Sequence, residues 1–392
     1  AADAVPKPRN DIEPFWGPHQ AGIITPAQSH TYFAALDLTT TKRDDLVSLL
    51  RGWTNAAARL TQGQSIDPVR LAQAYGQGSD AVTPDSGDAL GLSPARLTIT
   101  FGFGPGIFVK DNKDRFGLAA RRPEAFVDLP KFTGDQLVPA LTGGDLSIQA
   151  CADDPQVAFH AVRQLALVAS GVAEIRWSQT GFLSRPAEGG TPRNLMGFKD
   201  GTQSPKPVDK AVWVGKEGPD WMQGGSYMVM RRIRIALEHW DRTAVDFQEQ
   251  TFGRHKLSGA PIGLKDEFAP LGLDRTDADE NPVIAENAHV RMANAANIGA
   301  AEILRRGYSY NDGANFVAER WPPWRQAIEY DAGLLFVCYQ NDPRTGFIKT
   351  FVNMAKLDML NQFTTHTGGG LFACSGGVRQ GTFIGAGLFD KA

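Results

Sequence analysis

The sequence has few cysteines and no long apolar run. Its 392 residues include three cysteines, Cys151, Cys338 and Cys374, which are far apart and lack C-x-x-C spacing, so neither a disulfide framework nor a zinc ribbon is predicted. No run of about 18 uncharged apolar residues occurs, which excludes a transmembrane helix. Forty Lys and Arg residues are scattered among 43 Asp and Glu residues, for a formal net charge of −3. A nucleic-acid partner is therefore not favoured.

Several common catalytic motifs are also missing. The chain has no G-x-x-x-x-G-K-[ST] phosphate loop, no H-E-x-x-H zinc motif and no G-x-S-x-G nucleophile elbow. Seven histidines are present, but no two have the close spacing of a local metal chelate. A haem site needs only one axial side chain, because the porphyrin supplies four nitrogens. Haem is therefore compatible with this pattern, although composition does not choose among the seven histidines.

What the sequence does contain is an internal repeat. Residues 146–159 are typical of a strand, an Asp-Pro turn and a helix start, and residues 334–347 repeat this pattern. The Asp-Pro pairs at Asp154 and Asp342 lie 188 residues apart, close to half the chain. The repeat predicts two similar halves, each with the strand and helix order of a ferredoxin-like fold. The alternative is chance similarity between two common strand–turn–helix units.

Periodicity predicts individual elements and a boundary between the halves. Apolar residues at three- and four-residue steps indicate a helix over 42–62, and the apolar run 21–24 indicates a first strand. The Pro- and Gly-rich stretch 184–207 lies between the repeats. We therefore predict an α+β fold of two ferredoxin-like domains, 1–190 and 191–392, with antiparallel sheets and peripheral helices.

Three further segments carry residues suited to chemistry. Asp200 lies between two glycines in 194–202, His289 lies in 286–294, and adjacent arginines occur in 303–310. A carboxylate fixed by flanking glycines can exchange protons with a ligand that the backbone approaches closely. Each segment also has an ordinary interpretation, respectively a turn, a capping histidine and a solvated face.

Together these segments resemble the dye-decolourising peroxidase family, and more narrowly its exported, EfeB-like members. The family motif G-x-x-D-G occurs as Gly197–Gly201, H-[VI]-R-x-A-N as His289–Asn294, and L-R-R-G-Y-S-Y as Leu304–Tyr310. Flanking similarities at 15–23, 333–340 and 360–374 extend the resemblance over most of the chain.

The resemblance implies two ferredoxin-like domains in a barrel-like α+β arrangement, with haem b in the second domain. It makes His289 the axial ligand of the haem iron, and Asp200 and Arg305 the catalytic pair on the opposite, distal side. Asp358 is our candidate for the carboxylate that supports the axial histidine. The other residues expected to contact the cofactor are Gly197, Phe198, Gly201, Arg306 at a propionate, and Leu334 and Phe336 over the distal face.

The implied function is a peroxidase that uses hydrogen peroxide to oxidise dyes, phenolics or other one-electron donors through a ferryl intermediate. The first alternative is a haem-handling, iron-releasing protein of the cell envelope, similar to a deferrochelatase. The second is an α+β module without a cofactor. The start Ala-Ala-Asp-Ala resembles the remainder of a cleaved A-x-A site. With the family resemblance it predicts export, through the twin-arginine route; a homo-oligomer is also compatible with the sequence.

Overall fold

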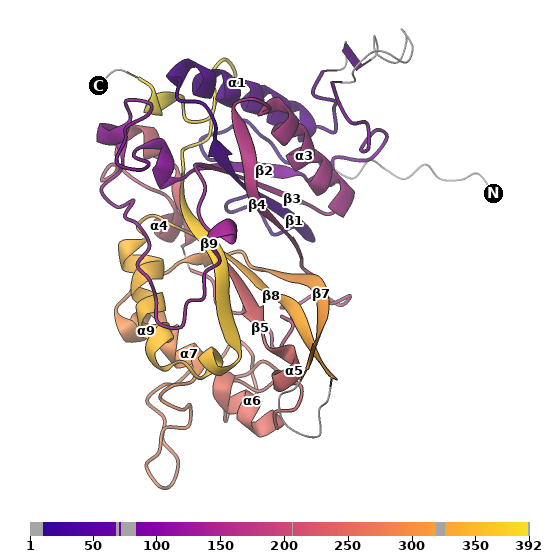
Figure 1. Ribbon diagram of the computed structural model, residues 1–392. Helices are drawn as coiled ribbons and strands as arrows, with labels where there is room; N and C mark the ends of the chain where they lie inside the picture. The colour runs from indigo at the N-terminus through magenta and orange to yellow at the C-terminus, as the bar shows by residue number, and fades with distance from the viewer. Residues whose placement is uncertain (1–10, 68–69, 72–83, 206, 319–325, 391–392) are drawn as a thin grey trace, which may run out of the picture.

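The strands of both halves form one antiparallel sheet that closes on itself (Figure 1). The computed structural model describes residues 11–67, 70–71, 84–205, 207–318 and 326–390. Within these residues the strand order is β5-β9-β2-β3-β1-β4-β7-β8-β6, and an additional β5–β8 pairing joins the two ends. The predicted α+β fold with antiparallel sheets and a barrel-like arrangement is confirmed.

The N-terminal half follows the ferredoxin-like order. Its elements are β1 (His30–Leu38), α1 (Arg43–Leu60), β2 (Thr98–Phe103), β3 (Leu146–Ala152), α3 (Pro155–Val168) and β4 (Ala173–Phe182). The strands lie side by side as β4-β1-β3-β2, and both helices pack on the outer face of this sheet. The helix predicted over 42–62 is therefore α1. Its Trp53 donates the indole N–H to the Leu165 carbonyl oxygen of α3 at 2.8 Å.

The C-terminal half repeats the same order with a longer first connection. Its elements are β5 (Ser226–Ile235), α5 (Leu237–Trp240), α6 (Val245–Phe252), α7 (His289–Met292), α8 (Ala295–Ile298), β6 (Leu304–Arg305), β7 (Tyr308–Ala318), β8 (Gln326–Gln340), α9 (Lys349–Leu357) and β9 (Thr364–Cys374). The strands lie side by side as β9-β5-β8-β7, the arrangement of the first half. Helix α4 (Val208–Val212) precedes β5.

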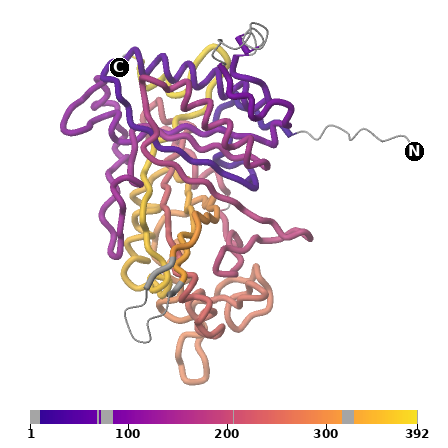
Figure 2. The backbone as a smooth tube through the Cα atoms, turned by 45° about the vertical axis from the view of Figure 1, so that its right-hand side comes forward, coloured from indigo at the N-terminus to yellow at the C-terminus, as the bar shows by residue number. Residues whose placement is uncertain are grey.

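Two short pairings join the halves. Phe103 of β2 pairs with Ala373 of β9, and Phe182 of β4 pairs with Ser309 of β7. The inner faces of the two halves of the sheet then share one core, which contains Phe33, Trp177, Met228, Met230, Tyr308, Tyr310, Leu335, Val337, Tyr339 and Phe372. In Figure 2 the halves stack end to end, and the yellow C-terminal segment returns to the first half. The domain boundary at 190/191 stays a prediction.

The prediction of a strand at 21–24 is wrong. This segment forms turns, and the first strand begins at His30. Gly22 has a φ of +96°, and a Cβ on it would lie 2.4 Å from Thr100 Oγ1. Ile23 is fully buried in the inner core. The residues of this run are therefore apolar because the turn is buried against β2. The N-terminal residues 1–10, used for the export prediction, lie outside the described residues.

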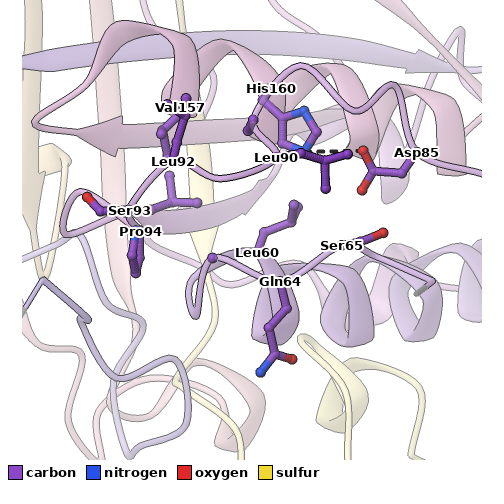
Figure 3. Close-up of a pocket in the computed structure, with 13 residues that line it drawn as sticks. Leu60, Gln64, Ser65, Asp85, Leu90, Leu92, Ser93, Pro94, Val157 and His160 are labelled. Atoms are coloured by element: carbon purple, nitrogen blue, oxygen red, sulfur yellow. Dashed lines mark ion pairs between the residues drawn. The ribbon is translucent and has the colours of Figure 1, made fainter. Parts of the chain in front are cut away.

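A small cavity lies in the N-terminal half, between the end of α1 and α3 (Figure 3). Its volume is about 30 Å³, and its lining includes Leu60, Val157 and His160. His160 Nε2 lies 3.6 Å from Asp85 Oδ1. A space of this size holds a water molecule but no organic cofactor. Among the described residues, no helix has the length and apolarity needed to cross a membrane.

The repeated Asp-Pro unit generates a stability prediction. Asp154 caps α3, because its Oδ1 accepts the N–H groups of Gln156 at 2.7 Å and Val157 at 3.1 Å. Replacing Asp154 by Ala leaves these two donors without their acceptor and should lower the free energy of unfolding by about 1 kcal/mol. Urea unfolding followed by circular dichroism measures the change, with Glu188→Ala on an exposed loop as the control. Equal stability of both variants would contradict this role.

Candidate active site

A tight turn holds Asp200 in place. Asn194 Oδ1 accepts the N–H groups of Met196 at 3.1 Å and Phe198 at 3.2 Å, and the Asn194 N–H bonds the Phe198 carbonyl oxygen at 3.0 Å. Gly197 closes the turn with a φ of +85°, a conformation that favours glycine. The Asp200 N–H then donates to the Pro192 carbonyl oxygen at 2.9 Å. The two-glycine motif is thus a backbone device that fixes this carboxylate.

Phe198 anchors the same turn from within the core. Its ring is 1% exposed and stacks on Phe252 of α6 at a centroid distance of 4.0 Å. The ring of Phe252 in turn contacts the His289 ring edge-on, with a distance of 5.8 Å between the ring centroids. Leu334 of β8 packs against this aromatic cluster. One cluster therefore connects the Asp200 turn, His289 and β8, and Phe198 is placed to position these groups.

The Asp200 carboxylate faces Arg305. Asp200 Oδ1 lies 3.5 Å from Arg305 Nη1, and the two side chains are 35% and 37% exposed. Arg305 Nη2 also donates to the Gln203 carbonyl oxygen at 3.1 Å, which ties the arginine to the same loop. A guanidinium keeps its charge at all physiological pH values, so a fixed positive charge lies beside this carboxylate. The structure brings these two predicted catalytic residues together.

Strand β8 forms an apolar wall on the same face as Arg305. Arg305 pairs with Cys338 across the ladder, and paired residues share a face of the sheet. Phe336 and Leu334 lie two and four residues before Cys338, so their side chains point to that face as well. Both are half-buried, and the ring of Phe336 packs on that of Phe347 with 5.8 Å between the ring centroids. Their predicted place beside Arg305 agrees with this geometry.

His289 is held by a buried carboxylate. It is the first residue of α7, and its Nδ1 lies 2.7 Å from Oδ2 of Asp358, whose side chain is 1% exposed. Asp358 Oδ1 accepts the Leu360 N–H at 2.9 Å, which fixes the carboxylate in turn. The Nδ1–H bond leaves the Nε2 lone pair available, and no described residue bonds Nε2. An imidazole oriented by a carboxylate is the arrangement of a metal-ligating histidine.

The contact of Arg306 with a haem propionate stays a prediction, and in the structure this side chain bonds other protein groups. Its guanidinium donates to the Thr25 carbonyl oxygen and to Gln28 Oε1, and the residue is 6% exposed. Neighbouring residues of an extended segment point to opposite faces of a sheet. Arg305 therefore faces the site, and Arg306 faces the core shared by the two halves.

Sequence reasoning missed Glu267, which holds the Asp200 loop from both sides. Its carboxylate accepts hydrogen bonds from the Thr191 hydroxyl and the Lys199 ammonium, and from the Thr202 hydroxyl at 3.1 Å. Burial raises the pKa of Glu267, but the bonds from Lys199, Thr191 and Thr202 outweigh it and hold that pKa below its ordinary value. No local motif marks this glutamate, since it lies 65 positions beyond Thr202.

The donor set fits haem. Among the described residues, no three His, Cys, Asp or Glu side chains gather as a group that could hold a metal ion. A porphyrin supplies four nitrogens and needs one axial side chain, which His289 Nε2 can provide. Gly201, with a φ of +106°, has no atom within 4 Å of the position that a Cβ would take, so the loop beside Asp200 presents open backbone.

Comparison with known proteins decides the family. The sequence matches the family described as Dyp-type peroxidase in its N-terminal part over residues 20–183 and in its C-terminal part over residues 191–379. The chain belongs to the Dyp-type peroxidase family. This membership confirms the activity that we predicted, a peroxidase, and haem as the cofactor. The roles of the individual site residues stay predictions.

Relatives of this peroxidase carry two different names. It is 36% identical to the dye-decolorizing peroxidase of Thermobifida fusca (strain YX), over 95% of this chain and 84% of the relative. It is also 36% identical to the deferrochelatase of Escherichia coli (strain K12), over 96% of this chain and 86% of the relative. The oxyferrous complex of DtpA from Streptomyces lividans is 37% identical, with a TM-score of 0.84 and coverage of 97% and 98% of the two chains.

The His289–Asp358 contact generates a prediction about haem affinity. Asp358→Asn removes the charged acceptor of the Nδ1 proton and should weaken haem binding about 10- to 100-fold. Titration of the cofactor-free protein with haem, followed by absorption, measures the affinity. Asp241→Asn, on an exposed helix end, is the control. An unchanged affinity and spectrum in Asp358→Asn would show that the carboxylate does not support the axial ligand.

Glu267 generates a prediction about pH. A carboxyl group whose pKa is lowered in the folded state stabilises the fold above its unfolded-state pKa and loses this contribution as pH falls through the folded-state pKa. Glu267→Gln should therefore lower the free energy of unfolding near neutral pH, and the difference from wild type should shrink below about pH 4.5, the ordinary value. Urea unfolding at a series of pH values tests this, with the neighbouring Asp266→Asn as control. A pH-independent difference would contradict the assignment.

Proposed function

We propose that this peroxidase reduces hydrogen peroxide at haem held between His289 and the Asp200–Arg305 pair, and takes the electrons from aromatic or other one-electron donors. The observation that carries the proposal is the 3.5 Å contact between Asp200 and Arg305, on the sheet face that Leu334 and Phe336 cover. When bound, haem supplies the iron that binds peroxide and the oxidising equivalents for the donor.

Asp200 is the proton carrier in this proposal. Cleavage of peroxide with loss of water requires one proton to move from the inner oxygen to the outer oxygen. An ionised carboxylate takes up the first proton and returns it to the leaving oxygen. The Asn194 turn and Glu267 hold the carboxylate in place while it does so.

Arg305 supplies the fixed charge. Its guanidinium stabilises negative charge as it develops on the peroxide oxygens. On the other side, Asp358 accepts the Nδ1 proton of His289 and increases the donor strength of Nε2. Leu334 and Phe336 restrict water at the distal face.

Because Arg305 and Asp200 have different roles, their variants should slow the reaction with peroxide to different degrees. Arg305→Leu should slow the reaction with peroxide by about 10²–10³-fold, because water cannot replace a fixed cation. Asp200→Ala should slow it less, because a water molecule can partly substitute as proton carrier. Stopped-flow mixing of each variant with peroxide at several pH values measures both rates. Near-wild-type rates in both variants would remove the roles assigned here.

Iron release is the second candidate, because the chain is as similar to a deferrochelatase as to a dye-decolorizing peroxidase. Incubation of the haem-loaded protein under reducing conditions without peroxide distinguishes the two activities. The fluorescence of metal-free porphyrin would reveal iron release, whereas rapid oxidation of a donor on addition of peroxide supports the peroxidase.

We also propose export through the twin-arginine route, on the resemblance to exported members of the family. Fractionation of cells that express the full precursor tests it, and an encoded precursor without a twin-arginine signal would contradict it. A homo-oligomer also remains a proposal, which the mass of the purified protein in solution tests.

A further inference from the structure

A second hollow lies far from His289 in the sequence, on the outer surface of the first half. It has a volume of about 430 Å³ and is lined by His30, Thr31, Tyr32, Pro155, Ala158, Phe159, Thr180, Gly181, Phe182 and Asn311. These residues come from the start of β1, the first turns of α3, the end of β4 and strand β7. We call this hollow the aromatic groove.

The paired strands β1 and β4 form the floor of the groove. His30 pairs with Phe182 and Tyr32 with Thr180, so all four side chains share the outer face. Phe159 of α3 forms a wall, and its ring meets the Tyr32 ring edge-on at 5.6 Å. Phe159 is 44% exposed and Phe182 is 36% exposed. Two large rings thus stay in contact with solvent where the sheet and the helix diverge.

The lining indicates the kind of ligand. It contains no Asp, Glu, Lys or Arg, so nothing in it compensates an ionic group. Aromatic walls favour a planar ring through stacked and edge-on contacts, and the volume is in the range of small-molecule sites. No described residue lies within hydrogen-bond distance of the His30 ring, which leaves it able to accept a hydrogen bond from a ligand.

The groove is also connected to the catalytic face through the sheet. Gly181 lies on its floor, and a Cβ there would be 2.8 Å from the Cβ of Tyr308 on the inner side. Tyr308 pairs with Leu335, and Arg305 pairs with Cys338, three residues further along β8. Three residues of a strand span about 10 Å. The groove floor and the distal arginine are therefore attached to one short stretch of β8.

We propose that the aromatic groove binds the reducing substrate, an uncharged phenol or arylamine of one or two rings. This inference rests on the proposed peroxidase function. For a phenol the reaction is H₂O₂ + 2 ArOH → 2 H₂O + 2 ArO•. Each ArOH gives one electron, which crosses the sheet and reduces the peroxide-oxidised enzyme, and one proton, which His30 accepts and passes to solvent.

The first test measures binding of guaiacol to the haem-loaded enzyme without peroxide. In the double variant Phe159→Ser/Phe182→Ser, Kd should rise about tenfold or more, and KM for guaiacol oxidation should rise by a similar factor. The haem spectrum and the oxidation of ferrocyanide, an anionic donor that the groove does not suit, should stay as in wild type. Phe247→Ser is the matched control, because Phe247 has the same 36% exposure as Phe182 but lies on α6.

An unchanged Kd and KM in the double variant, or an equal loss in Phe247→Ser, would overturn the proposal. The binding measurement needs no turnover, so it decides the groove independently. If wild type oxidises neither guaiacol nor ferrocyanide, the proposed function fails, whereas normal ferrocyanide oxidation with unaltered guaiacol binding in the double variant rejects the groove alone.

The second test concerns His30. His30→Gln should lower kcat for guaiacol about tenfold, because a proton acceptor is lost, with little change in KM. The loss should be absent for N,N,N′,N′-tetramethyl-p-phenylenediamine, an uncharged aromatic donor that has no proton to give. A kcat that falls equally for ferrocyanide, or for this donor, would show that His30 is not the acceptor.

Discussion

The alternation of side chains along β8 determines which residues form the site and which form the core. Leu335, Val337 and Tyr339 point inward and join the core inside the closed sheet. Leu334 and Phe336 point outward, and this outer face is where α7 and α9 place His289 and its carboxylate. A slip of one residue would exchange the two sets. The inner core, which both halves share, therefore fixes the register on which the site depends.

Two carboxylates that differ in burial complete the site. Asp358 is almost fully buried and orients one imidazole, whereas Asp200 is partly exposed and lies beside a guanidinium. Burial suits a group that must hold another side chain in one place, and partial exposure suits one that must exchange protons. Glu267 belongs to the first kind, although it touches neither His289 nor Arg305. It holds the loop through residues on both sides of Asp200.

Sequence patterns predicted the parts of this structure that have a local cause. The periodicity over 42–62 marks α1, and the Asp-Pro repeat marks β3 and β8 as the equivalent third strands of the two halves. The run at 21–24 was wrongly predicted as a strand, because a buried turn and a buried strand both require apolar residues. The bonds of Arg306 to Thr25 and Gln28 were not predicted, because a motif does not say which distant groups a buried guanidinium meets. Glu267 was missed because its partners are distant in sequence.

The two halves share a strand order, yet one of them holds the site, and the difference lies in a single connection. In the first half, the connection from β1 to β2 contains the 18-residue helix α1, which packs tightly on the outer face of the sheet. In the second half, the corresponding connection runs from β5 to β7 and replaces that helix by α5, α6, α7, α8 and the short strand β6. Short helices joined by loops cannot cover a sheet face as continuously as one long amphipathic helix. They instead bring Phe252 and His289 to the aromatic cluster that packs against Leu334 of β8. The expanded connection therefore carries the site on a face that α1 and α3 cover in the first half, while both halves share the inner core.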